Sequence, residues 1–253
     1  MKLKKKVMAA VLASAVSMSL IVPSFAIDLP MTYVENGYYT SDSEASDAFI
    51  QYVDSCMADI DHTIVVNNAG DDVTADSLPV IQDLYANNDY TGIRGYMSSM
   101  HYSLGSITER AQTRAFASRN VDCNFYHCEE DSRYQLGKEW LTTVTGTYTY
   151  DVNTYNITHT DNPSIRLNSN TNFGYYFSPY MDEVTTKSQI SGGKGIVSFS
   201  GTYKMLARVD YVFTGQNNVS AIITIPVGAT LDFGTFTDSF AIYAEEEPED
   251  RVP

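Results

Sequence analysis

The sequence predicts an α+β protein, in which N-terminal helices are followed by an antiparallel β-sheet or β-sandwich. Apolar residues recur every three or four positions before about residue 112, and they alternate with polar residues after it. Helices first and strands second is the order typical of this class. We divide the chain into a signal peptide (1–26), a mainly helical N-terminal region (27–112), an antiparallel β-rich domain (113–244) and an acidic disordered tail (245–253).

The first 26 residues have the pattern of a secretory signal peptide. Met1–Lys6 is basic, Val7–Val22 is uncharged and largely apolar, and Pro23–Ala26 places small residues where an A-x-A-like cleavage site is read. A membrane anchor needs ~18 to 20 apolar residues, and Asp28 follows too early for that. We therefore expect cleavage near Ala26 and a secreted, extracellular protein. The lysine-rich start is bacterial in style.

Helical spacing is clearest just after this leader. Ser41–Glu44 fits a capping box, and the apolar positions that follow form one stripe: Ala45, Phe49, Tyr52, Val53, Cys56 and Ile60. We expect a helix over about 42–61, a short strand over 63–66, and a second helix from near Asp76 or Ser77 with Pro79 in its first turn. Residues 90–112 keep the helical spacing, but three glycines weaken it.

Alternation is clearest from Val197 to Phe213, where odd-numbered positions are mostly apolar and even-numbered positions mostly polar. Such a run predicts an antiparallel strand with one buried face. Because a strand of this length would reach ~55 Å at ~3.3 Å per residue, we expect a bulge or bend, with Gly201 as its natural place. A more central strand is expected over Val219–Val227, and shorter ones near 165–169, 172–178 and 236–243.

The chain is strongly acidic, with 31 acidic and 16 basic side chains and a net charge of −15. Removal of the leader takes away four lysines and no acid, which moves the net charge from −15 to −19. Phosphate backbones and anionic lipids repel such a protein, so we expect no nucleic-acid partner and no membrane partner. The acidic clusters at 67–72 and 129–131 lack the spacing of a calcium loop, and we expect no metal and no cofactor.

Two of the three cysteines lie in the stretch Cys123–Cys128, "CNFYHC". A zinc site would need four ligands, and a catalytic pair would need an imidazole that reaches the thiolate. Positions five apart face opposite ways on a straight strand, and secreted thiols tend to be oxidised. We therefore predict a disulfide between Cys123 and Cys128 across a turn, with Cys56 buried as a free thiol. A longer bridge from Cys56 to either of them is the alternative.

The sequence contains no catalytic motif in the structural context that its chemistry needs. Ser191–Lys194 matches S-x-x-K, but its glycines and its place before the long alternating run indicate a loop, whereas this chemistry needs a helix start. The sequence contains no G-x-S-x-G, no H-E-x-x-H and no phosphate-binding loop. We therefore assign no catalytic residue.

Tyrosine is the remaining compositional feature, with 19 tyrosines against one tryptophan. Phe173–Tyr180 holds five aromatic residues in eight. Exposed tyrosine rings suit recognition of sugars or proteins, so we predict a binding platform formed by Tyr175, Tyr176 and Tyr180. The competing interpretation is that these rings fill half-exposed sheet faces.

Together these observations favour a secreted, non-enzymatic interaction module that recognises an extracellular glycan or protein. A secreted hydrolase with dispersed catalytic residues is the first alternative. A membrane-acting β-hairpin toxin is the second. The long alternating run favours the toxin, whereas Lys204, Arg208 and Asp210 on its polar face count against it.

Overall fold

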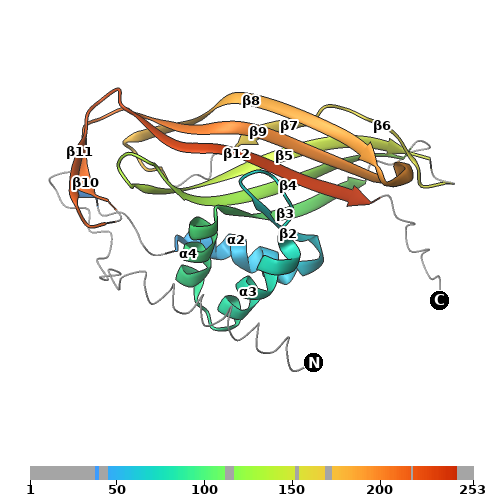
Figure 1. The fold of residues 1–253 in the computed structure, drawn as a ribbon, viewed down its shortest axis with the longest axis horizontal. Helices are drawn as coiled ribbons and strands as arrows, with labels where there is room; N and C mark the ends of the chain where they lie inside the picture. The colour runs from blue at the N-terminus through green and yellow to red at the C-terminus, as the bar shows by residue number, and fades with distance from the viewer. Residues whose placement is uncertain are drawn as a thin grey trace.

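The structure, a computed structural model, describes residues 38–39, 45–111, 117–151, 154–168, 173–217 and 219–243. The predicted signal peptide, the capping box at 41–44 and the acidic tail lie outside the described residues. Within them the chain is mostly antiparallel β-sheet, with three α-helices on its N-terminal side (Figure 1). The α+β prediction is confirmed at this level.

Helices α2 (Asp47–Ala58), α3 (Thr74–Ala86) and α4 (Tyr90–Met100) form one layer. Helix α2 begins later than predicted because Ser46 caps it: the Ser46 side chain accepts a hydrogen bond from the Phe49 amide at 3.1 Å. Helix α3 begins earlier than predicted, so Pro79 lies inside it and not in its first turn.

The ambiguous stretch 90–112 divides into a helix and a strand. Asp89 caps α4 by accepting a hydrogen bond from the Gly92 amide at 2.8 Å. His101 adopts a left-handed conformation (φ 54°) that ends the helix. Strand β3 begins at the next residue, so part of the region predicted as mainly helical belongs to the β-sheet.

The larger sheet has the order β2-β3-β4-β5-β6, with β7 also paired to β5, and its described pairings are antiparallel. Its strands are β2 (Thr63–Asn67), β3 (Tyr102–Ala111), β4 (Ala117–Glu130), β5 (Gly137–Tyr150), β6 (Ile157–Thr160) and β7 (Ser164–Leu167). The short strand predicted over 63–66 is confirmed as β2.

A second sheet has the order β12-β9-β8, formed by β8 (Phe177–Ser191), β9 (Ile196–Val209) and β12 (Thr230–Tyr243). The bulge predicted at Gly201 is wrong: β9 is continuous there, and the register shifts lie in its partners, at Asp182/Thr185 and Asp232/Gly234. Gly201 instead makes room, since a Cβ at this position would lie 2.8 Å from the Ile165 side chain.

The third sheet is small and lies at one end of the molecule (Figure 1). It consists of β1 (Tyr38–Tyr39), β10 (Phe213–Gln216) and β11 (Ile222–Ile225), in the order β1-β10-β11. Strands β10 and β11 form an antiparallel hairpin, and β1 pairs with β10 in parallel.

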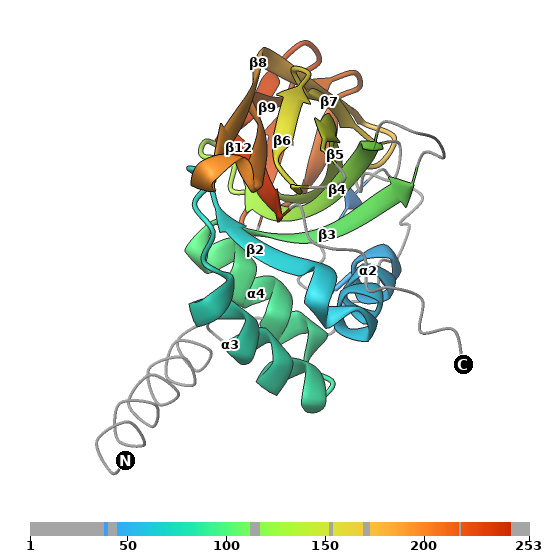
Figure 2. The same ribbon diagram turned by 90° about the vertical axis from the view of Figure 1, so that its right-hand side faces the viewer.

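The helices cover the outer face of the larger sheet, and the inner face packs against β8, β9 and β12 (Figure 2). Alternation along β4 supplies both cores, since Phe125 points inward and Tyr126 points toward the helices. The edges of the two sheets also meet, where the Thr237 amide donates to the Asn68 carbonyl at 3.0 Å and the Ser239 hydroxyl donates to the Gly70 carbonyl. The helices and the outer face of the larger sheet thus form one hydrophobic core.

Candidate functional site

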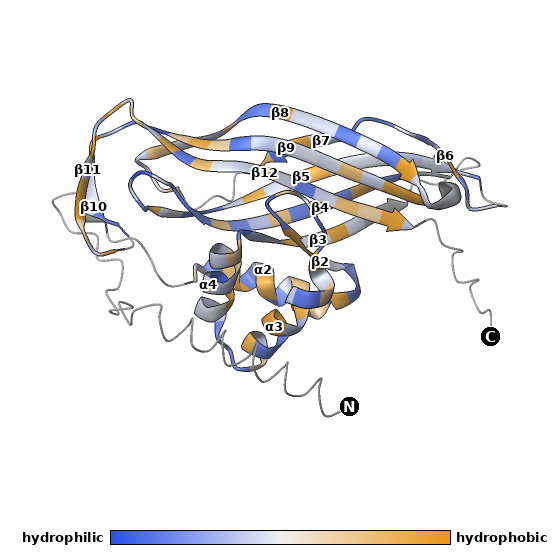
Figure 3. Cartoon of the chain, viewed as in Figure 1, coloured by the Kyte–Doolittle hydropathy of each residue, from blue (hydrophilic) through white to orange (hydrophobic). Residues whose placement is uncertain are grey.

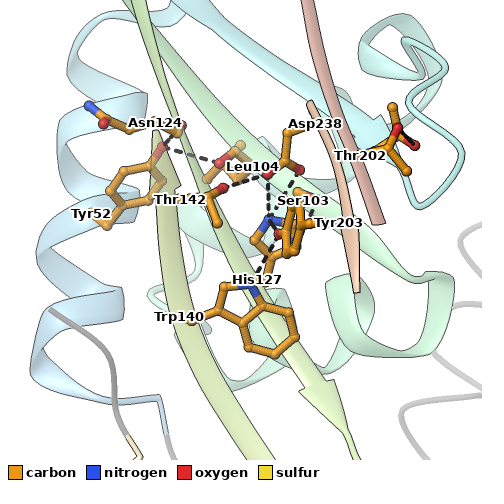
Figure 4. Close-up of polar contacts among 11 residues, drawn as sticks. Tyr52, Ser103, Leu104, Asn124, His127, Trp140, Thr142, Thr202, Tyr203 and Asp238 are labelled. Atoms are coloured by element: carbon orange, nitrogen blue, oxygen red, sulfur yellow. Dashed lines mark hydrogen bonds and ion pairs between the residues drawn. The ribbon is translucent and has the colours of Figure 1, made fainter. Parts of the chain in front are cut away.

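A buried polar network lies between the two large sheets, formed by Ser103, His127, Trp140, Thr142, Tyr203 and Asp238 (Figure 4). His127 occupies its centre because β4 directs it inward, on the face that also carries Phe125. His127 Nδ1 lies 3.1 Å from Ser103 Oγ on β3. His127 Nε2 lies 3.0 Å from the Tyr203 hydroxyl on β9 and 3.1 Å from Asp238 Oδ1 on β12.

Residues of β5 complete this network. Thr142 Oγ1 donates to Asp238 Oδ2 at 2.5 Å, and Trp140 Nε1 donates to the Tyr203 hydroxyl at 3.2 Å. The indole of Trp140 also stacks on the His127 imidazole, with ring centroids 5.0 Å apart and an interplanar angle of 8°. Burial, followed by the nearby Asp238 charge, raises the pKa of Tyr203 well above its ordinary value, so its hydroxyl keeps its proton.

Serine, histidine and aspartate are the residue types of nucleophilic hydrolases, and here they stand in one hydrogen-bonded row. However, Ser103, His127 and Asp238 are 2 %, 1 % and 0 % exposed. A scissile carbonyl cannot approach a serine buried in this way, because nucleophilic attack needs contact with the substrate. What the row does provide is a polar connection between β3, β4 and β5 on one sheet and β9 and β12 on the other.

A second buried carboxylate joins the helices to the larger sheet. Glu139 Oε1 accepts from Arg94 Nε of α4 at 2.5 Å, while Oε2 accepts from Ser46 Oγ at 2.5 Å and from the Tyr126 hydroxyl at 3.0 Å. Ser46 therefore caps α2 and at the same time ties that helix to β5. Every partner comes from a structural element, which indicates a role in packing.

The three cysteines are buried free thiols, so the predicted Cys123–Cys128 disulfide is wrong. The turn it required does not exist, because both residues lie on the continuous strand β4. Cys123 faces the second sheet, whereas Cys128 faces the helices. Burial raises the pKa of Cys56 to about 11 and raises the pKa values of Cys123 and Cys128 well above the ordinary thiol value, which makes all three poor nucleophiles.

The described residues contain neither a group of metal ligands nor a helix that could span a membrane. In that part of the chain no group of three or more His, Cys, Asp or Glu side chains is placed to hold a metal ion. None of the described helices is long and apolar enough to cross a membrane. Ser191 precedes a short 3-10 turn, Gly192–Lys194, which joins β8 to β9 as a hairpin, as its glycines predicted.

The structure places the predicted tyrosine platform in two parts. Tyr175 and Tyr176 lie in the turn before β8, which begins only at Phe177. Tyr175 stacks on Tyr211 with centroids 4.6 Å apart and planes at 12°, and Tyr176 packs edge-on against both. Tyr180 lies along β8 and, among the described residues, makes no ring contact with this cluster.

Tyr211 belongs to a segment with an unusual composition. From Tyr211 to Leu231 the sequence contains no Asp, Glu, Lys or Arg, although 19 % of the whole chain is charged. This segment contains β10 and β11, and its hydrophobic character along the hairpin is visible in Figure 3. We call the exposed side chains here, together with Tyr175, the uncharged end: Tyr175, Tyr211, Val212, Val219, Ile222 and Val227.

These side chains are well exposed for their size. Ile222 is 73 % exposed and Tyr175 is 68 % exposed. The aromatic run at 173–180 predicts Tyr175 but none of the other residues of the uncharged end. The signal that could have found them is the charge-free stretch itself, because exposed loops and edge strands of an acidic protein normally carry charges.

Comparison with protein-family models, with curated proteins and with solved structures finds no significant match to this chain.

Proposed function

We propose that this chain is an extracellular interaction module that recognises a protein partner through the uncharged end. One observation carries the proposal: five large hydrophobic side chains are exposed within Tyr211–Val227, in a chain with a net charge of −15. Grouped exposed apolar residues mark sites where proteins bind one another. The signal-peptide pattern at residues 1–26 supports a location outside the cell.

The geometry of the uncharged end favours a protein over a glycan. Sugar recognition by aromatic residues uses open ring faces, but Tyr175 and Tyr211 cover one face of each other. The other exposed side chains of the uncharged end are aliphatic, among them Val212 and Ile222, and they offer no hydrogen bonds to hydroxyl groups. Tyrosine beside aliphatic side chains is instead the composition of the core of a protein–protein interface.

The two alternative functions receive less support. A hydrolase that used Ser103 and His127 would need both side chains to be accessible, and both are buried. A β-hairpin toxin would need the long alternating strand to be available for a membrane. Strand β9 is instead the central strand of its sheet, and its odd-numbered side chains, such as Phe199 and Tyr203, fill the cores.

Site-directed photo-crosslinking tests this proposal. A benzophenone amino acid replaces Tyr211 in one variant and Tyr243 in another. Both are exposed tyrosines, but Tyr243 is the last residue of β12, which ends at the opposite end of the molecule from β10 and β11 (Figure 1). Each purified variant is irradiated with the extracellular fraction of the source cells. We expect one discrete protein adduct from position 211, which excess unlabelled wild type suppresses, and none from position 243. Equal adducts at both positions, or transfer only to glycans, would contradict the proposal.

A further inference from the structure

We infer that the partner binds as an extended segment that adds a strand to the outer edge of β11. This inference rests on the proposed function and specifies the partner's chemistry: a segment with apolar side chains at alternate positions and with Lys or Arg at its flanks. Strand addition is a known mode of protein recognition, in which backbone hydrogen bonds give affinity and alternate side chains give specificity.

The register of the β10–β11 hairpin determines where the backbone groups of β11 point. The Asn217 amide donates to the Ala221 carbonyl at 3.0 Å, which makes this pair a hydrogen-bonded pair of the hairpin. Hydrogen-bonded and non-hydrogen-bonded pairs alternate along antiparallel strands. In the observed register Ile222 faces Gln216 and Thr224 faces Thr214, so both are non-hydrogen-bonded pairs. The N–H and C=O groups of Ile222 and Thr224 therefore point away from β10, toward the open edge.

The outer edge of β11 is open and uncharged. Strand β11 ends the order β1-β10-β11, and among the described residues no strand pairs with its outer side. Ile223 and Ile225 pack into the core, which anchors the strand, while Ile222 and Thr224 are exposed on the other face. Proteins normally protect such edges with charges or bulges. This edge has neither along its four residues.

The opposite edge of the same small sheet already accepts an extended segment. Strand β1 pairs with β10 through Tyr38 and Tyr39, opposite Thr214 and Gly215. The hairpin therefore has one paired edge, where β1 comes from a distant part of the chain, and one open edge along β11. Addition of a strand to β11 would continue this sheet by the same backbone pairing.

The negative net charge of the protein favours basic residues at the flanks of the partner segment. The contact itself is uncharged, but the body of the protein carries 31 acidic side chains against 16 basic ones. A segment with basic flanks is therefore attracted to the protein, and an acidic one is repelled. For the same reason a second copy of this chain is the less favoured occupant of the edge, because it carries the same net charge of −15.

A designed peptide tests the inference on the full chain. The probe is Lys-Lys-Thr-Val-Thr-Val-Thr-Lys-Lys, and binding is followed by calorimetry and by the amide NMR signals of Ile222–Ile225. Two matched probes carry glutamate flanks or N-methylated valines. We expect saturable binding of the first probe, binding weaker by about tenfold or more for the glutamate probe at low salt, and none for the N-methylated probe. Equal binding of the N-methylated probe would mean contact through side chains alone and would overturn the inference, as would failure of the first probe to bind.

A proline variant supplies the control within the protein. Thr224→Pro removes an outward amide that β10 does not use, and edge strands tolerate proline at such positions; Thr224→Val keeps the amide. We expect Thr224→Pro to weaken peptide binding by about tenfold and Thr224→Val to leave it unchanged. If the variants bind equally, strand addition is wrong, whereas the Tyr211 crosslink still tests the proposed function separately. Self-association in sedimentation experiments that Thr224→Pro abolishes would show that the occupant is a second copy, which would also overturn the inference.

Discussion

Removal of the Asp238 carboxylate should destabilise the fold far more than removal of a similar carboxylate at the surface. In Asp238→Ala, the Thr142 hydroxyl loses its acceptor and His127 Nε2 loses the carboxylate 3.1 Å away. Both groups remain fully buried, because the surrounding sheet faces are apolar. Leaving a buried polar group without its partner costs about 1–3 kcal/mol, so the loss of these two buried contacts should remove a large share of the roughly 5–15 kcal/mol that holds a domain folded.

The chain contains its own control for this substitution. His159 and Asp161 form a similar pair at 3.2 Å, with side chains 68 % and 64 % exposed. Solvent screens such a pair, so Asp161→Ala should change the free energy of unfolding by less than about 1 kcal/mol. The two substitutions remove the same chemical group from the same type of partner and differ mainly in burial.

Urea unfolding followed by tryptophan fluorescence measures both effects. Trp140 is the single tryptophan and stacks on His127, so its signal reports on the network directly. We expect the midpoint for Asp238→Ala to fall strongly and that for Asp161→Ala to stay near the wild-type value, with similar slopes. Equal losses of stability for the two variants would refute the argument that burial makes the Asp238 network stabilising.

Three further predictions concern thiols, pH and packing. In native protein at pH ~8, Cys56, Cys123 and Cys128 should resist iodoacetamide, because burial raises their pKa values. In denaturant, mass spectrometry should find all three alkylated. Rapid labelling of the native protein would contradict the buried position of these thiols. Burial also raises the pKa of Glu129, so the folded state binds a proton more tightly than the unfolded chain, and stability falls as the pH rises above the ordinary glutamate pKa. Glu129→Gln should remove this fall, which urea titrations at a series of pH values would measure. Gly146→Ala would place a Cβ 2.6 Å from the Phe199 ring and should lower the free energy of unfolding by about 1–3 kcal/mol. Gly95→Ala on α4 would place a Cβ with no atom within 4 Å and should raise the free energy of unfolding by about 0.5–1 kcal/mol. If thermal unfolding shifts in the same direction for both variants, the packing at these glycines is not what separates them.

Local sequence patterns predicted much of the fold. The stripe that contains Phe49 and Val53 predicted α2, and the alternation after Val197 predicted β9 with the correct inward face. The ends of these elements were less predictable, because they depend on particular contacts. Ser46 caps α2 where its side chain also meets Glu139, and that partner lies 93 residues away.

The polar network could not be predicted because its members are distant in sequence. His127 and Asp238 are 111 residues apart and come from different sheets. Each does occupy an inward position of a strand whose neighbours on that face are apolar, which is the trace that the network leaves in the sequence. The disulfide failed for a related reason: proximity along the chain suggested a turn, whereas the sheet keeps β4 extended through Cys123 and Cys128.

The structure brings together two of the three tyrosines of the predicted platform. The aromatic run identified Tyr175 and Tyr176, but their main partner, Tyr211, comes from a different loop. Tyr180 was grouped with them only because it is near in sequence, and the strand carries it away from the cluster. Whether these rings bind a partner stays a prediction for the crosslinking experiment.

The meeting of β12 with the turn after β2 has a consequence for the order in which the chain can fold. Residues 68–70 are made early, but their partners, Thr237 and Ser239, are made about 170 residues later. Strand β12 also supplies Asp238 and Phe240 to the interior between the sheets. Contacts so distant in sequence form late and slowly. A chain still emerging from a ribosome therefore lacks the piece that closes its interior, and complete folding waits until synthesis has passed β12.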